Sequence, residues 1–428
     1  MLAFGSFRLL TGQRLLLQAG KPLRLGNRAL DILMLLLERP GELVGKDELL
    51  ARVWPNVLVV EDNLTVHVAA LRRALGDGKG AARYIVNAPG RGYRFVAPVE
   101  RQAEYPAADA AAPGLPPRLT RLIGREAELA KLLQSGRSRR LTTITGPGGV
   151  GKSALALEAA ERLAPQFEHG ARLVDLAAPD DPLSTLGAAL ADKRMLLVLD
   201  NCDPVIDPLA PLVVALLRAA PGVRLIATSR EALRVEGEQL LRLAPLAVPR
   251  EGVTPEGALS FGGIELFVDR ATAHSSDFAL TDATIGPVIR LCRLLDGLPL
   301  AIALAAARID VFGAAGLADR LPDGLDLLAP GLRTAPDRHQ SLRACFDWSR
   351  RFLSEAESLA LRLLAEFPDD FTLEEAMAAL PAPELLAGLV AKSLVAADLG
   401  GPAARYKLLQ TVRSCALALP AARSAVDI

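Results

Sequence analysis

Cysteine is scarce in this 428-residue chain, which contains only four, and no two of them form a CxxC pair. This scatter disfavours both a zinc site and a disulfide framework, because each needs cysteines at set spacings. We therefore expect four reduced residues packed in hydrophobic cores, namely Cys202, Cys292, Cys345 and Cys415.

Long hydrophobic runs are missing too. The longest uncharged apolar stretches, such as residues 299–307, are much shorter than the roughly 18 residues that suggest a membrane span. The first residues are polar and lack the apolar core of a signal peptide. We therefore expect a cytoplasmic protein without membrane contact. No repeat of fixed period is present, which disfavours a solenoid.

Net charge is absent as well, because 49 Lys and Arg residues balance 49 Asp and Glu residues. The balance is uneven, since residues 1–99 hold 14 basic and 8 acidic side chains. A basic module at one end favours a polyanion as its partner, although charge also varies between ordinary domains. Hydrophobic residues make up 51% of the chain, which excludes a wholly disordered polymer.

The predicted fold class is multidomain α/β. At roughly 100–200 residues per domain, the length predicts two to four domains. An Ala- and Pro-rich linker separates the basic module from strand-like runs that alternate with helical patterns, which predicts a parallel sheet with crossover helices. Helical patterns dominate the rest. The predicted divisions are 1–99, a linker at 100–118, a nucleotide-binding domain at 119–248, a helical subdomain at 249–330, a winged-helix-like subdomain at 331–420 and a tail at 421–428.

Three short helices are predicted in the basic module. Asn27 is the candidate N-cap of the first helix, which Pro40 and Gly41 end. In the third helix, at about 62–75, apolar residues recur at steps of four, three and four. They form one buried stripe of Leu64, Val68, Leu71 and Leu75. The opposite face carries small and polar side chains edged by arginine, so it can approach DNA closely.

A hairpin wing follows the helices, because strand-like arms flank a turn at residues 89–92 with Arg91 at its tip. The blocks FGSFRL, KPLRL, ELVGKDELLARVW, VHVAALRRAL and GRGYRF resemble the winged-helix DNA-binding domain of OmpR/PhoB-type response regulators. This resemblance implies an N-terminal sheet, a recognition helix in the major groove of double-stranded DNA, and Arg91 at the minor groove or a phosphate.

The candidate DNA-contacting residues lie on this helix and wing. They are Asn63, Thr65, Val66, His67, Ala69, Ala70, Arg72, Arg73, Arg91 and Arg94. The alternative is a winged helix that mediates only protein contacts. The arginines disfavour that alternative, because they match the phosphate backbone of a duplex better than a protein surface.

The strongest motif is the glycine-rich loop GPGGVGKS at residues 146–153, which fits GxxxxGK[ST]. It lies between a strand-like run and a helix that begins near Lys152, which is the context that a phosphate-binding loop requires. Lys152 would neutralise the β- and γ-phosphates of ATP, and Ser153 would ligate Mg²⁺. The predicted loop contacts are Gly146, Gly148, Gly149, Val150, Gly151, Lys152 and Ser153.

A second apolar strand ends in Asp200, which is placed to complete the Mg²⁺ shell with Ser153. The next residue is Asn201, where a vigorous hydrolase of this class has an acid, and Asp203 is the candidate substitute. The candidate catalytic residues are therefore Lys152, Asp200 and Asp203. We predict at most a slow ATPase, in which the bound nucleotide acts as a switch.

A third strand ends in Thr228 and Arg230, beside the expected γ-phosphate position. An arginine there can sense the terminal phosphate, because its charge-assisted hydrogen bonds are lost with ADP. Further along, GLPL at residues 297–300 opens a helical run. By itself this tetrapeptide indicates only a helix that starts with proline.

Taken together, LIGREAEL, GPGGVGKS, LLVLDNCD, ATSRE, GLPLAIALAAARI, SLRACFDWS and LVAKSLV resemble the STAND (NB-ARC or AP-ATPase-like) signalling NTPases. In particular, the chain resembles bacterial transcriptional regulators that join an OmpR-type winged helix to this ATPase. The resemblance covers roughly residues 119–417. It implies a helical subdomain and a second winged-helix subdomain at about 335–417, which closes over ADP.

The resemblance also implies nucleotide contacts outside the loop. It places Arg230 at the terminal phosphate, Pro299 against the base, and three residues near adenine or ribose, namely Ile123, Gly124 and Arg125. The family's Met-His-Asp triplet would fall near residues 408–410, which read Leu-Leu-Gln, so its histidine contact is missing.

The main hypothesis is a cytoplasmic transcription regulator whose self-association and binding to promoter DNA are switched by ATP and ADP, with RNA polymerase kept as a candidate partner. Bringing two DNA-binding modules together raises affinity without a new base contact. One alternative is a degenerate signalling scaffold that holds ADP permanently. Another is an ATP-driven enzyme that remodels DNA, which Asn201 disfavours.

Overall fold

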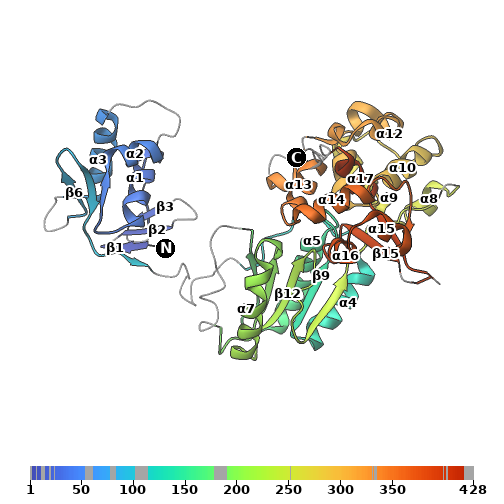
Figure 1. Cartoon of the computed structure of the whole chain (residues 1–428), viewed down its shortest axis with the longest axis horizontal. Helices are drawn as coiled ribbons and strands as arrows, with labels where there is room; N and C mark the ends of the chain where they lie inside the picture. The colour runs from blue at the N-terminus through green and yellow to red at the C-terminus, as the bar shows by residue number, and fades with distance from the viewer. Residues whose placement is uncertain are drawn as a thin grey trace. The chain divides into compact units, whose positions relative to one another are not determined.

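A computed structural model describes most of the chain. The described residues are 2–5, 7–10, 15–18, 21–23, 25–53, 61–77, 83–101, 114–177, 190–250, 252–329, 331, 335–398, 400–401 and 403–418. Two compact units are present, residues 1–112 and 113–428, and both are drawn in Figure 1. The boundary between them falls inside the predicted linker. Part of that linker and the predicted tail at 421–428 lie outside the described residues.

The first unit opens with an antiparallel sheet of strand order β4-β3-β2-β1-β8. This confirms the N-terminal sheet that the winged-helix resemblance implied. The ring of Phe4 packs edge to face against those of Tyr84 and Phe95 and joins this sheet to the rest of the core. The strands are β1 Leu2–Phe4, β2 Phe7–Leu10, β3 Leu15–Gln18, β4 Lys21–Pro22 and β8 Glu100–Arg101.

Three helices and a second, three-stranded sheet of order β5-β7-β6 complete this unit. The predicted N-cap at Asn27 was wrong. Gly26 is extended and caps the helix, and its carbonyl accepts a hydrogen bond from Leu30 at 3.0 Å, so Asn27 is already the first helical residue. The elements are α1 Asn27–Glu38, β5 Leu43–Gly45, α2 Lys46–Val53, α3 Glu61–Leu75, β6 Ile85–Ala88 and β7 Gly92–Phe95.

The second unit is built on a parallel five-stranded sheet of order β10-β11-β12-β9-β13. This confirms the parallel sheet that the alternating pattern predicted, and its apolar strands form a buried core with the flanking helices. The edge strand β13 has polar ends and was not predicted. The strands are β9 Leu141–Thr145, β10 Ala171–Asp175, β11 Leu196–Asp200, β12 Arg224–Ser229 and β13 Glu238–Arg242.

Helices flank this sheet, as the crossover connections of a parallel sheet require. They are α4 Glu126–Ser138, α5 Lys152–Leu163 and α7 Ile206–Ala219. A helical subdomain follows the sheet, as expected, with α8 Pro255–Ala258, α9 Gly262–His274, α10 Asp282–Leu294, α11 Pro299–Ala306 and α12 Ile309–Arg320.

The C-terminal part combines helices with an antiparallel sheet of order β14-β16-β15 around its own core. This composition is that of a winged helix. Its elements are α13 Leu342–Arg350, α14 Glu355–Leu364, β14 Phe371–Thr372, α15 Leu373–Ala379, α16 Pro383–Ala391, β15 Val395–Asp398, β16 Arg405–Leu408 and α17 Gln410–Leu417. Short 3-10 turns complete the unit at Ala164–Gln166, Asp203–Val205, Leu321–Asp323, Leu325–Leu328 and Asp337–His339.

The four cysteines are free thiols, and all except the half-buried Cys345 are buried, as expected. Among the described helices, none is long and apolar enough to cross a bilayer.

Candidate functional site: a glycine-rich loop and a recognition helix

The predicted phosphate loop joins the end of β9 to the start of α5, so the motif has its required strand-loop-helix context. An added Cβ at Gly146 would lie 2.6 Å from the carbonyl oxygen of Leu243. At Gly149 it would lie 2.9 Å from Cβ of Leu300. Both glycines also have positive φ, so the tight course of the loop requires them.

Lys152 turns back onto its own loop. Its Nζ donates hydrogen bonds to the carbonyl oxygens of Gly146 at 2.8 Å and Pro147 at 3.0 Å. Burial lowers the pKa of Lys152 to about 8, and the carboxylate of Asp203 opposes this shift. The carboxylate of Asp203 acts on this ammonium group only at a distance, and a bound phosphate would place an anion in direct contact with it.

The carboxylate of Asp200 lies directly beside the loop. Its Oδ1 accepts a hydrogen bond from Oγ of Ser153 at 2.7 Å and a second from the hydroxyl of Thr228. Asp200 ends β11, and α5 follows β9, which is separated from β11 by the strand β12. The carboxylate of Asp200 nevertheless reaches Ser153 in the first turn of α5. The structure thus brings together the two residues that the sequence assigned to Mg²⁺, and it adds Thr228 as their neighbour.

Asn201 has φ +59° and its amide joins two strand ends. The Nδ2 atom donates to Asp200 at 3.1 Å and to Asp175 at 2.9 Å. The amide therefore holds the carboxylates of β10 and β11 next to each other, a role that sequence reasoning missed. Asp175 ends a strand at the same sheet edge, which is the signal that was available.

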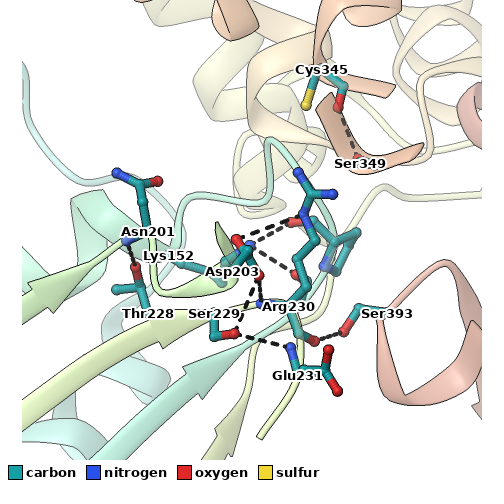
Figure 2. Close-up of polar contacts among 12 residues, drawn as sticks. Lys152, Asn201, Asp203, Thr228, Ser229, Arg230, Glu231, Cys345, Ser349 and Ser393 are labelled. Carbon is teal, nitrogen blue, oxygen red and sulfur yellow. Dashed lines mark hydrogen bonds and ion pairs between the residues drawn. The ribbon is translucent and has the colours of Figure 1, made fainter. Parts of the chain in front are cut away.

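Asp203 has a different task from the one suggested for it. Its Oδ1 accepts hydrogen bonds from the backbone N–H of Arg230 at 2.7 Å and from the hydroxyl of Ser229 at 3.2 Å. Its Oδ2 lies 3.9 Å from Nε of Arg230. As Figure 2 shows, these contacts hold Arg230 in place, and the catalytic role suggested for Asp203 stays a prediction.

Arg230 is buried, with 7% of its surface exposed, and Nη1 has no hydrogen-bond acceptor among the described residues. Its guanidinium lies 5.7 Å from the centre of the Phe352 ring. Burial lowers the pKa of Arg230, and Asp203 opposes that shift. A buried guanidinium nitrogen without an acceptor is costly, so this position favours an anionic ligand.

The C-terminal subdomain also lines the site, which the sequence did not reveal residue by residue. Beside Gly148, an added Cβ would lie 2.8 Å from Sγ of Cys345 and 3.6 Å from Oγ of Ser349, both on α13 (Figure 2). The hydroxyl of Ser393 donates to the carbonyl of Arg230 at 2.5 Å. The SLRACFDWS block pointed to this segment as a family motif but not to a contact with the loop.

Of the three residues expected near adenine or ribose, Arg125 contacts the loop. Ile123 is buried, and an added Cβ at Gly124 would lie 2.6 Å from Cα of Gly262. Arg125 is also buried, and its Nη2 donates to the carbonyl of Val150 at 3.0 Å. Its guanidinium therefore braces the loop, and nucleotide contact by this trio remains a prediction.

Pro299 begins α11 beside the phosphate loop. An added Cβ at Gly151 would lie 4.0 Å from its Cγ. The next residue, Leu300, donates its backbone N–H to the carbonyl of Gly149 at 3.1 Å. The structure thus brings the GLPL segment to the loop, and contact of Pro299 with a base stays a prediction.

In the first unit, the predicted stripe of α3 is buried at Leu64, Val68, Leu71 and Leu75. The opposite face is exposed, as predicted, at Asn63, Thr65, Val66, Ala69, Ala70 and Arg73. His67 is half-buried. Val66 keeps 64% of its surface exposed, so the helix presents apolar and small side chains that can contact base edges.

The wing forms as predicted, with β6 and β7 paired and the backbone N–H of Arg91 donating to Ala88 at 2.9 Å. The side chains of Arg91 and Arg94 are exposed. Between them, Gly92 has φ +151°, and an added Cβ there would lie 2.0 Å from the carbonyl oxygen of Val44. Glycine is therefore required for β7 to approach β5.

Arg72 differs from the other candidate DNA contacts. Its Nη2 donates to the carbonyl of Ile85 at 2.6 Å, and its Nε lies 3.3 Å from Oδ2 of Asp77. Asp77 in turn accepts hydrogen bonds from the backbone of Tyr84 and Ile85. Arg72 therefore ties α3 to the wing with part of its guanidinium, and a contact of this partly exposed side chain with DNA stays a prediction.

Comparison with known proteins gives matches over both units. Residues 20–95 match the family described as "Transcriptional regulatory protein, C terminal". A protein of Mycobacterium tuberculosis named as an HTH-type transcriptional regulator is 40% identical over 307 residues, which span 65% of this chain but only 33% of that protein. The chain thus spans about a third of the length of this relative.

A second M. tuberculosis protein, named as uncharacterized, is 35% identical over 329 residues, which span 70% of this chain and 81% of that protein. The solved DNA-binding domain of CadC from E. coli is 29% identical, with a TM-score of 0.22, and the match covers 23% of this chain and 94% of that domain. The chain therefore belongs to the same family as these mycobacterial proteins, and residues 20–95 form a transcriptional regulatory domain of the OmpR/PhoB winged-helix type.

Proposed function

We propose that this chain is a DNA-binding transcriptional regulator whose affinity for DNA is switched by ATP or ADP at the loop of residues 146–153. The observation that carries the proposal is the hydroxyl of Ser153 held 2.7 Å from the carboxylate of Asp200, directly beside a glycine loop at a helix N-terminus. The winged-helix family match supports the DNA half.

The residues at the loop fit a nucleotide with Mg²⁺. In proteins Mg²⁺ usually keeps several waters and takes its other oxygen ligands from one or two protein groups and the substrate phosphates, and Ser153 and Asp200 would provide the protein pair. Within the described residues no group of three metal-binding side chains competes with this site. Lys152 would neutralise the phosphate charge, and the unpartnered Nη1 of Arg230 would donate to the terminal phosphate.

The same geometry favours a switch over a fast enzyme. The position after Asp200 carries an amide, that of Asn201, and this amide is engaged by two carboxylates. Asp203 is engaged by Arg230 and Ser229. With an amide where the acid would stand, and with Asp203 engaged in structural contacts, we expect slow hydrolysis at most.

The DNA half rests on shape and charge. α3 would enter the major groove with its exposed face, and the wing arginines Arg91 and Arg94 would contact the backbone or the minor groove. Because DNA-binding domains act more tightly as pairs, nucleotide-dependent self-association is the route by which the second unit would control the first.

The test measures DNA affinity by fluorescence anisotropy with ATP, ADP and no nucleotide, on duplexes first selected with the wild-type chain. We expect an affinity difference of about tenfold between ATP and ADP, an ordinary coupling between two sites. Lys152→Ala should abolish this difference and keep the nucleotide-free affinity. Lys407→Ala, whose side chain is half exposed in the C-terminal subdomain, is the matched control. Identical affinities in every combination would refute the switch.

A further inference from the structure

Among the described residues, no strand pairs with the outer side of the edge strand β13, where the carbonyl of Leu240 accepts a hydrogen bond from Nε2 of Gln239 at 3.4 Å. The backbone N–H of Leu243, just after the strand, donates to the carbonyl of Thr145 on β9 at 2.7 Å. Backbone groups of a strand point alternately to its two sides, so the odd-numbered residues face β9 and the even-numbered ones face outward. Leu240 and Arg242 therefore direct their N–H and C=O groups away from the sheet.

A groove flanks this edge on each face of the sheet. The first, called here the lid groove, has a volume of about 430 Å³ and lies between Leu240, Arg242 and Leu243 on one side and Leu394 and Val395 on the other. The second, called the α4 groove, has a volume of about 290 Å³ and lies between β13 and α4. Its strand residues include Gln239 and Leu241.

The register places the two grooves on opposite faces. Gln239 is paired with Thr142, and both line the α4 groove. Arg242 is paired with Thr145, and both line the lid groove. Leu240, a large apolar residue with 37% of its surface exposed, lines both grooves at the open edge.

The charge along this edge has one sign. Among the described residues that line the grooves, the charged ones are all basic, namely Arg234 and Arg242 in the lid groove and Lys131 and Arg139 in the α4 groove. Arg234 also lies 3.8 Å from Glu231. The nearest acid on the strand is Glu238, and its carboxylate already accepts hydrogen bonds from the backbone of Leu233 and Arg234.

We propose that β13 is a docking site for an extended acidic segment of a partner protein, which adds to the sheet as a sixth strand. Main-chain hydrogen bonds to Leu240 and Arg242 would provide affinity. The side chains of an added strand alternate between the two faces, so they would enter the two grooves in turn, while carboxylates would pair with the flanking cations. Open edges of this kind are ready templates for strand pairing.

The test uses the full chain and a fluorescent nine-residue peptide in which pairs of glutamates alternate with pairs of valines, so that carboxylates lie on both faces of the strand. Two control peptides carry lysine in place of glutamate, or N-methyl groups on consecutive backbone nitrogens, which block both edges of the peptide strand. We expect saturable anisotropy binding of the acidic peptide and at least tenfold weaker binding of both controls. Equal binding of the acidic and N-methylated peptides would show simple charge attraction and overturn strand addition.

Two variants locate the site. Leu240→Pro removes an outward N–H group without touching the inward ladder, so peptide binding should fall at least tenfold. Arg242→Glu reverses the charge of one cation that lines the lid groove and should weaken peptide binding. This variant tests the site independently if Leu240→Pro does not fold. If the chain instead self-associates in sedimentation experiments and Leu240→Pro abolishes that association, the occupant is a second copy and the proposal is wrong. Normal binding by folded forms of both variants overturns it as well.

Discussion

Asp296 caps a helix that begins with Gln410 and Thr411, more than a hundred residues further along the chain. One carboxylate oxygen accepts hydrogen bonds from both the backbone N–H and the hydroxyl of Thr411, each at 2.9 Å. The other accepts from the backbone N–H of Gln410 at 2.9 Å. Asp296 directly precedes the GLPL segment that touches the phosphate loop, so one side chain links the loop-contacting segment to the C-terminal subdomain.

The first prediction concerns this cap. Asp296→Ala removes the acceptors of two helix N-terminal N–H groups, so the free energy of unfolding should fall by about 1–2 kcal/mol. Thr411→Val removes only the hydroxyl and should cost less. Denaturant unfolding monitored by circular dichroism measures both. Equal stability of the wild type and Asp296→Ala would show that the cap contributes nothing.

The second prediction concerns pH and Lys152, whose pKa burial lowers to about 8. Binding of a polyphosphate needs the ammonium form, so ADP affinity should be constant below this pKa and should fall as the pH rises through it. Bound phosphate would itself raise the pKa of Lys152. The decline in ADP affinity should therefore begin near the pKa of the free protein and continue up to the higher pKa of the complex.

Calorimetric titration with ADP between pH 6.5 and 9.5 checks this expectation. The control is Lys152→Arg, because a guanidinium stays protonated throughout this range and should give a flat profile. A decline of the same size in Lys152→Arg would assign the pH dependence to another group.

The third prediction concerns the contact between the phosphate loop and α13. Gly148→Ala would place a Cβ 2.8 Å from Sγ of Cys345, so the C-terminal subdomain should pack less well and the melting temperature should drop. Cys345→Ala removes the clashing sulfur, so the double variant should regain most of the loss. A double-mutant cycle of melting temperatures measures this coupling. Purely additive changes in melting temperature would mean that residues 148 and 345 do not interact in the folded chain.

The fourth prediction separates two arginines of the DNA-binding unit. Arg91→Ala should weaken binding to any duplex and reduce the slope of log affinity against log salt by about one, because one phosphate contact is lost. Arg72→Ala should instead lower the stability of the unit, since Arg72 holds Ile85 and Asp77. Salt titrations and thermal unfolding of both variants distinguish the roles. A lower salt slope in a fully stable Arg72→Ala variant would return Arg72 to the interface.

Local patterns predicted the elements well where burial repeats at a fixed period. The stripe from Leu64 to Leu75 identified α3, and the apolar run before Asp200 identified β11, because each buries a continuous face. The edge strand β13 escaped prediction because only one of its sides is paired and its ends are charged. The N-cap at Asn27 was predicted wrongly because the cap is the residue with extended backbone, and the sequence Gly26-Asn27 does not reveal which of the two is extended.

The sequence by itself determined the glycine loop at residues 146–153 and its strand-loop-helix context, since the glycines, lysine and serine of the motif lie close together and their spacing is set by local geometry. It also determined the winged helix, whose stripe and hairpin are short-range patterns. Only the tertiary structure decided that Asp203 holds Arg230, that Arg72 ties a helix to the wing, and that Cys345 lies against Gly148. These contacts join residues far apart in the chain, and their partners are selected by how strands and subdomains pack, which no local period encodes.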